Sequence, residues 1–284
     1  MSQPLHVVGV IGAGTMGHGI AQVSAQAGYS VVLYDVTIEQ AQTGKQRIEK
    51  NLQGGIEKGK VSPEEMKATL ARIAPTCAMA DFAPCQLVIE AAPEKMDVKQ
   101  AAFEQLSHLC APTAILASNT SSLSLTEIAA AATHPERVVG LHFFNPVHLM
   151  KLLEVVRAFQ TSDDTLATVR EFGARIGKQL VEVRDHPGFA SSRLGLALGL
   201  EAIRMVEEGV ASPADIDRAM ELGYGHPMGP LKLTDLVGLD VRLSIAEYLY
   251  QELGSPTFRP PQLLKKMVRA GKLGKKSKEG FYRY

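Results

Sequence analysis

The sequence predicts an α/β N-terminal domain built on a doubly wound parallel sheet, followed by an all-α C-terminal domain. Two observations carry this prediction. Short β-branched runs alternate with helical stretches up to residue 186, and strand-like runs almost disappear after it. The chain has 284 residues, which suggests two domains at roughly 150 residues per domain. We therefore expect the α/β domain at 1–186 and the helical domain at 187–284.

The start of the chain predicts a β-α-β unit. Val7–Ile11 is a β-branched run, and a helical spacing of apolar residues follows from Thr15 to Ala27. Val31–Tyr34 is a second strand-like run. A β-α-β unit of this length places its two strands parallel, with a right-handed crossover.

Further helices and strands are predicted along the rest of this domain. Helical sequence runs from Glu39 to about Lys60, and Ser62-Pro63-Glu64-Glu65 begins another helix. A serine cap, a proline at the first position and acidic residues in the first turn are all typical of a helix start. Five more apolar runs predict the remaining strands: Leu87–Ile89, Ala114–Ala117, Val138–Leu141, Leu152–Val156 and Leu180–Val183.

The C-terminal part shows three helical stretches. These are Phe189–Glu208, a segment that begins at Ser212-Pro213, and Thr234–Leu253. Gly209 follows the first stretch and Gly254-Ser255-Pro256 follows the last, and such residues are typical of helix ends.

The composition argues against several classes of partner. Lys plus Arg and Asp plus Glu both number 30, so the chain lacks the positive field that nucleic-acid or anionic-membrane binding needs. The apolar stretch Leu194–Leu200 is far shorter than the roughly 20 residues of a membrane span. The first residues show no targeting segment, and three cysteines without metal-ligand spacing fit a reducing compartment. We expect a soluble, cytoplasmic protein without a metal, a nucleic-acid partner or a membrane partner.

A glycine-rich motif follows the first predicted strand. Gly12-Ala13-Gly14-Thr15-Met16-Gly17 is a G-x-G-x-x-G at the start of a helix. In a Rossmann-type domain Gly12 makes the tight turn, Gly14 lets the backbone approach a pyrophosphate, and Gly17 lets the helix lie close to the strand. A purely structural glycine turn is the alternative. The strand before the motif and the helix after it favour dinucleotide binding.

Asp35 follows the second predicted strand, eighteen residues beyond Gly17. A carboxylate there would accept hydrogen bonds from the adenosine ribose and repel a 2′-phosphate. No Arg or Lys occurs in the next three residues, so NAD is favoured over NADP. The alternative is a solvated aspartate at a strand end.

His142 and Glu154 are the candidates for proton transfer. His142 ends an apolar run, where open α/β sheets bind ligands, and an imidazole is the natural base for an alcohol proton near neutral pH. Glu154 lies inside an apolar run, where an ionised carboxylate is costly unless it is paired. A core histidine and a solvent-facing glutamate are the alternatives. A paired histidine and carboxylate would suit alcohol oxidation.

A row of polar residues, Ser118-Asn119-Thr120-Ser121-Ser122, follows the Ala114–Ala117 run. It offers hydroxyls and an amide near the same edge of the sheet. It could equally be a helix cap.

Taken together, these motifs resemble the L-3-hydroxyacyl-CoA dehydrogenase family, most closely its short bacterial 3-hydroxybutyryl-CoA members. The resemblance covers nearly the whole chain. It rests on GAGTMGHGIAQ from Gly12, EAAPE from Glu90, SNTSSL from Ser118, GLHFFNP from Gly140, KLLEVV from Lys151, HPGF from His186, HPMGPLKLTDLVGLD from His226 and the final GKKSKEGFYRY.

The resemblance implies roles for individual residues. His142 matches the family's catalytic base, Glu154 the carboxylate that orients it, and Ser121 the serine that hydrogen-bonds the reacting oxygen. Further matches line the cofactor or the acyl-CoA: Glu94, Lys99 and Asn119 at the cofactor, and Asn145 and Lys58 at the substrate. The implied reaction is reversible NAD-dependent oxidation of an L-3-hydroxyacyl-CoA, as in fatty acid β-oxidation. The family fold implies a homodimer formed through the helical domain, with substrate between the two domains.

The chain departs from the family pattern at Ser192, where the family usually has asparagine. Serine can still donate a hydrogen bond to substrate, but its reach is shorter, which bears on substrate range. Two other functions fit the same scaffold. One is a dehydrogenase of sugar acids or free hydroxy acids, and the other is a non-catalytic NAD-binding structural protein.

Overall fold

The computed structural model describes residues 5–284. The chain divides after Asp185 into two compact units, and each is described by itself. The first holds a sheet with helices and the second is helical, so the predicted fold class is confirmed.

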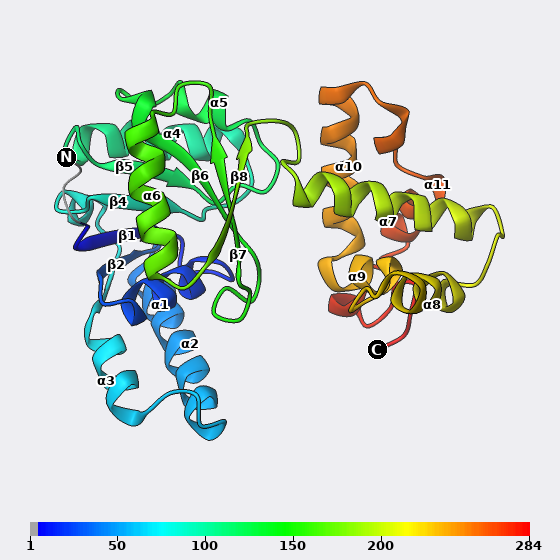
Figure 1. Cartoon of the computed structure of the whole chain (residues 1–284), viewed down its shortest axis with the longest axis horizontal. Coiled ribbons are helices and arrows are strands. Elements are labelled where there is room, and N and C mark those ends of the chain that lie inside the picture. Colours follow the sequence, from blue (N-terminus) through cyan, green and yellow to red (C-terminus); the bar gives the residue numbers. More distant parts are fainter. Residues whose placement is uncertain (1–4) are drawn as a thin grey trace. The chain divides into compact units, whose positions relative to one another are not determined.

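One sheet of eight strands forms the centre of the first unit (Figure 1). Its order is β3-β2-β1-β4-β5-β6-β7-β8, and every neighbouring pair is parallel except β6 with β7. The chain winds outward from β1 through β2 to β3, and then outward on the other side from β4. This reversal between β1 and β4 is the point where open α/β sheets bind ligands. The strands are β1 (Val7–Ile11), β2 (Ser30–Tyr34), β3 (Ile73–Thr76), β4 (Leu87–Glu90), β5 (Ile115–Ser118), β6 (Val138–Phe143), β7 (Leu152–Arg157) and β8 (Gln179–Arg184).

Helices cover the sheet, so its inner strands are buried on both faces and appear in the sequence as unbroken apolar runs. Ile20, Ile48 and Phe172 of three different helices share one core cluster with the strands. In the view of Figure 1, α6 lies in front of the sheet and α4 behind it. The helices of this unit are α1 (Gly17–Gln26), α2 (Ile38–Glu57), α3 (Pro63–Ala71), α4 (Met96–Leu109), α5 (Leu125–Ala129) and α6 (Asp163–Arg175), with short 3-10 turns at Met79–Phe82 and Pro135–Arg137.

Strand β3 is absent from the sequence-based prediction. Its four residues include Pro75, which cannot donate a backbone hydrogen bond. The strand pairs with β2 alone and forms the edge of the sheet, where proline is tolerated.

The second unit is a bundle of helices around its own core. The prediction of one helix over Thr234–Leu253 is wrong, because Gly238, with φ of 105°, ends α9 and precedes α10. The elements are α7 (Ser191–Glu207), α8 (Pro213–Tyr224), α9 (Pro230–Val237), α10 (Leu239–Leu253) and α11 (Gln262–Arg269), with 3-10 turns at Pro256–Phe258 and Lys275–Ser277. Among residues 5–284 no helix combines the length and the apolar character that a membrane span requires.

Buried Asp217 ties α9 and the C-terminal segment to α8. Its carboxylate accepts hydrogen bonds from the backbone of Leu231 (2.8 Å) and Lys232 (3.0 Å) and from the Tyr282 hydroxyl (2.7 Å). The first two bonds cap the α9 N-terminus, which has no cap from its own N-cap residue, Gly229.

Candidate active site

The glycine motif forms the turn between β1 and α1. Gly12 has φ of +89°, and a Cβ there would lie 2.7 Å from the Ala91 carbonyl oxygen. A Cβ at Gly17 would lie 1.6 Å from the Gly12 carbonyl oxygen. Both glycines are therefore required by the protein's own packing.

Gly14 differs from these two glycines. Apart from its own chain neighbours, no atom of residues 5–284 lies within 4 Å of the position that its Cβ would take, so the packing of these residues does not explain the missing side chain. Thr15 and Met16 follow it into α1, and Met16 at the N-cap makes no side-chain capping bond. Open space beside a backbone that leads into an uncapped helix N-terminus fits a phosphate group. These residues thus fit the pyrophosphate of a dinucleotide.

Asp35 lies at the end of β2, against the same turn. Its Oδ2 accepts a hydrogen bond of 2.8 Å from the Ala13 backbone, and its Oδ1 accepts one of 2.8 Å from the Val36 backbone. The carboxylate is therefore held next to the glycine motif. This placement suits the predicted contact with the adenosine ribose.

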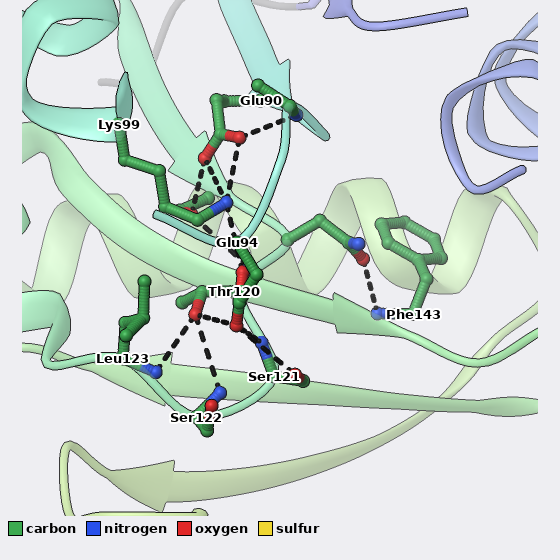
Figure 2. Close-up of polar contacts among 11 residues, drawn as sticks. Glu90, Glu94, Lys99, Thr120, Ser121, Ser122, Leu123 and Phe143 are labelled. Atoms are coloured by element: carbon green, nitrogen blue, oxygen red, sulfur yellow. Dashed lines mark hydrogen bonds and ion pairs between the residues drawn. The ribbon is translucent and has the colours of Figure 1, made fainter. Parts of the chain in front are cut away.

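A buried ion pair joins the end of β4 to α4 (Figure 2). The Lys99 ammonium donates to both oxygens of Glu90, at 2.9 and 3.1 Å, and lies 3.2 Å from Glu94 Oε2. The Glu90 side chain is 0% exposed and that of Lys99 is 1% exposed. The resemblance places Lys99 beside the cofactor. The structure places its ammonium between two carboxylates, out of contact with solvent.

Glu94 holds the segment that follows β5. Its Oε1 accepts hydrogen bonds from the Thr120 hydroxyl (2.6 Å), the Ser121 backbone (2.8 Å) and the Ser121 hydroxyl (3.2 Å). Burial alone would raise the pKa of Glu94. The Lys99 ammonium and the bonds from Thr120 and Ser121 outweigh burial, so the pKa of Glu94 lies below its ordinary value.

Asn119 connects this segment to β6. Its side-chain Oδ1 accepts a hydrogen bond of 2.9 Å from the Phe143 backbone, and its own backbone donates to the Glu90 carbonyl at 2.8 Å. Phe143 directly follows His142 in β6, so Asn119 links the two halves of the predicted site.

His142 and Glu154 form a buried pair on β6 and β7. The antiparallel register places them directly opposite each other, and His142 Nδ1 lies 2.8 Å from Glu154 Oε2. His142 is 7% exposed and Glu154 is 1% exposed, which excludes a solvent-facing glutamate. When Nδ1–H donates to the carboxylate, Nε2 is the basic nitrogen of the neutral ring.

Three further predicted site residues lie on other elements. Lys58 is exposed at the C-cap of α2, and Asn145 is exposed in the loop after β6. Ser192 lies in the first turn of α7, in the second unit. In the described part of the chain, no group of three or more His, Cys, Asp or Glu residues could hold a metal ion.

Glu90 is missing from the sequence-based prediction of the site, and Ser118 enters it only as the first member of the polar row that follows the Ala114–Ala117 run. Glu90 ends the buried run Leu87–Glu90. A carboxylate in such a run needs a partner, which is the argument that identified Glu154. For Glu90, the same requirement predicts a partner but does not identify Lys99.

Comparison with known proteins shows what the chain is similar to. Residues 7–186 match the model of the NAD-binding domain of 3-hydroxyacyl-CoA dehydrogenase, and residues 188–284 match the model of its C-terminal domain. Proteins named probable 3-hydroxybutyryl-CoA dehydrogenase from Deinococcus radiodurans and Bacillus subtilis are each 50% identical. The alignments cover 97% of this chain, with 99% of the first relative and 96% of the second.

A solved structure agrees with these matches. The crystal structure of (S)-3-hydroxybutyryl-CoA dehydrogenase from Ralstonia eutropha superposes with a TM-score of 0.96 at 41% identity, covering 99% of both chains. The family resemblance and the NAD cofactor inferred from the sequence are thereby confirmed.

Proposed function

Because the chain belongs to the 3-hydroxyacyl-CoA dehydrogenase family and is an NAD-dependent oxidoreductase, we propose that it reversibly oxidises L-3-hydroxyacyl-CoA to 3-ketoacyl-CoA. Short acyl chains are the preferred substrates, and 3-hydroxybutyryl-CoA is favoured. The names of the relatives from D. radiodurans and B. subtilis support this choice. The observation that carries the chemistry is the buried hydrogen bond between His142 and Glu154.

In the oxidation His142 acts as the general base. Its Nε2 accepts the proton of the substrate's 3-hydroxyl while the C3–H bond breaks and the C3=O bond forms. NAD, when bound, supplies the hydride acceptor. Glu154 keeps the imidazole oriented through Nδ1 and stabilises the imidazolium that forms. In the reverse direction the imidazolium returns the proton to the ketone oxygen.

Other residues bind the substrate and hold the site in place. The Ser121 hydroxyl, held by Glu94, hydrogen-bonds the reacting oxygen. Ser192, Asn145 and Lys58 contact the acyl-CoA. Asn119 lies near the cofactor. Its side-chain oxygen accepts a hydrogen bond from the Phe143 backbone and so holds the strand next to His142.

The cofactor side of the site uses the glycine turn and Asp35. The open space beside Gly14 takes the pyrophosphate, and Thr15 and Met16 lead into the helix whose N-terminus faces it. Asp35, already held against the turn, accepts from the ribose hydroxyls and disfavours NADP. Glu94 borders the nicotinamide side, and the buried Lys99 acts there through Glu94.

We also propose that the chain forms a homodimer through its helical unit and resides in the cytoplasm. The unit exposes large apolar side chains, among them Leu194 (72%), Leu222 (80%) and Tyr224 (79%), of the kind that interfaces cover. Cys77, Cys85 and Cys110 are all free thiols, which suits a reducing compartment. Sedimentation equilibrium should give twice the chain mass of 30.6 kDa.

Steady-state reduction with NADH tests the proposed function. Acetoacetyl-CoA should saturate the enzyme, and free acetoacetate should not be turned over at the same concentration. His142→Ala serves as the control for contaminating activity. Turnover of the free acid with no turnover of the thioester would assign the chain to free hydroxy acids. No turnover of either, with NADH bound, would assign it to non-catalytic NAD-binding proteins.

A further inference from the structure

Glu90 is a buried carboxylate of the first unit that has no role in the proposed proton transfer. Four hydrogen bonds converge on its two oxygens. Oε1 accepts from the Ala92 backbone (2.7 Å) and from Lys99 (2.9 Å), while Oε2 accepts from Lys99 (3.1 Å) and from the Ser118 hydroxyl (2.7 Å). A carboxylate that is 0% exposed is stable only when it is paired and hydrogen-bonded in this way.

Two routes lead from Glu90 to the segment that carries Ser121. The first runs through Lys99, whose ammonium also lies 3.2 Å from Glu94, and Glu94 binds the backbone and the hydroxyl of Ser121. The second runs through Ser118, which donates to Glu90 and accepts from the Thr120 backbone at 3.2 Å. Figure 2 shows Lys99 between the two carboxylates, with Thr120 and Ser121 next to Glu94.

The charges and the burial of these side chains show which residue holds which. Two carboxylates share one ammonium, and Lys99 is 1% exposed, so it cannot turn to solvent instead. Glu90 is fully buried, whereas 37% of the Glu94 side chain is exposed. Glu90 therefore anchors Lys99 from inside the unit, and Lys99 fixes the more exposed carboxylate to which Ser121 is bonded.

We propose that Glu90 is a positioning residue for the reaction. Acting through Lys99 and Glu94 on one route and through Ser118 on the other, it fixes the Thr120–Ser121 backbone so that the Ser121 hydroxyl meets the reacting oxygen. This role rests on the proposed function of Ser121.

Glutamine cannot replace Glu90 in this role. Its side chain has the same shape, but an amide has one acceptor oxygen and one N–H₂ group. In one orientation the N–H₂ faces the donors Ala92 N–H and Lys99. In the other it faces Lys99 and Ser118. Either way the charge is lost and Lys99 moves toward Glu94, which shifts the Ser121 segment.

A double-mutant cycle tests the route to Ser121. Glu90→Gln should lower kcat for acetoacetyl-CoA at least fivefold in the wild type. In a Ser121→Ala background the same change should lower kcat less than twofold, because the hydroxyl that it positions is gone. An unchanged kcat in Glu90→Gln, or an equal factor in both backgrounds, would refute the role. If Glu90→Gln does not fold, Ser118→Ala replaces it in the same cycle. Ser118→Ala should lower kcat by a smaller factor, and it should have no such effect in the Ser121→Ala background.

Amide hydrogen exchange of the protein without ligands gives a readout that is independent of activity. The Ser121 amide, which donates to Glu94, should exchange at least tenfold faster in Glu90→Gln than in the wild type. Unchanged exchange would contradict the proposal even if kcat fell. Because this measurement needs no turnover, it still decides the positioning role if acetoacetyl-CoA is not a substrate.

Two matched variants separate positioning from general loss of stability. Asp217→Asn makes the same chemical change at an equally buried carboxylate in the helical unit, and should lower the melting temperature without changing kcat or Ser121 exchange. Glu127→Gln changes an exposed glutamate on α5 and should change none of these. If Asp217→Asn reduces kcat as much as Glu90→Gln does, the effect of Glu90 is destabilisation alone.

Discussion

His142 and Glu154 face each other across the antiparallel β6–β7 pair, with Nδ1 and Oε2 2.8 Å apart. Side chains directly opposite each other in an antiparallel pair lie on the same face of the sheet. The register therefore delivers the carboxylate to the histidine without any loop. Slippage by one residue would turn Glu154 to the opposite face. The proposed base and its counter-ion thus depend on rigid strands.

Glu154→Gln should impair proton transfer while leaving the fold intact. Glutamine keeps the shape and can still accept from Nδ1–H, but it removes the charge that stabilises the imidazolium. We expect kcat for acetoacetyl-CoA reduction to fall at least tenfold, with the NADH dissociation constant unchanged within twofold. Stopped-flow turnover and fluorescence titration measure the two quantities. Normal turnover in this variant would show that the charge of Glu154 has no role.

Asp35→Ser should narrow the preference for NADH over NADPH. The carboxylate repels a 2′-phosphate and holds the Ala13 backbone, so its loss weakens NADH binding and relieves the repulsion of NADPH. The ratio of the two kcat/KM values should fall at least tenfold, which is about 1.4 kcal/mol. A wild type that prefers NADPH would exclude the assigned role of Asp35.

Much of the fold could be predicted from the sequence, because buried parallel strands are continuous apolar runs and several helices begin with side-chain caps. Ser62, for example, forms a capping box with Glu65. Two features could not be predicted in this way. Strand β3 contains Pro75, which argues against a strand until its place at the edge of the sheet is known. Gly238 divides α9 from α10 through a positive φ that helical periodicity does not reveal.

The candidate site could be predicted in part. The pair of His142 and Glu154 could be predicted, because a carboxylate inside a buried strand is stable only when it has a partner. The same requirement applies to Glu90, yet its partner Lys99 lies nine residues away on a helix, so the pairing appears only once β4 and α4 are packed. The family resemblance identified Lys99 and Glu94, but only the structure shows that they bind each other.

The pKa of Glu94 gives a prediction for acid pH. Because this pKa is lower in the folded protein, the stabilisation from ionised Glu94 is complete above the ordinary value of 4.5 and is lost as the pH falls through the folded value. The hydrogen bonds from Ser121 to the ionised Glu94 should therefore persist at pH 4.5. An NMR titration of the Glu94 carboxyl carbon should give a midpoint below 4.5, and Lys99→Met should raise it. A wild-type midpoint at or above 4.5 would contradict this account.

Ser192→Asn should alter how substrate is held. Asparagine is the residue usual in the family, and its side chain reaches further from α7 than serine does. We expect KM or kcat for acetoacetyl-CoA to change at least threefold, while the NADH dissociation constant stays constant. If both kinetic constants are unaffected, Ser192 lies outside the substrate site.

The kinetics of a His142→Ala, Glu154→Gln double variant test the central claim most directly. As a positioned general base, His142 should contribute roughly 100-fold or more to kcat, so His142→Ala should lose at least that much while NADH binding is retained. If His142 and Glu154 act as one unit, the double variant should be little slower than His142→Ala alone. Full activity in His142→Ala, or losses that multiply in the double variant, would show that the 2.8 Å pair is structural and that the base lies elsewhere.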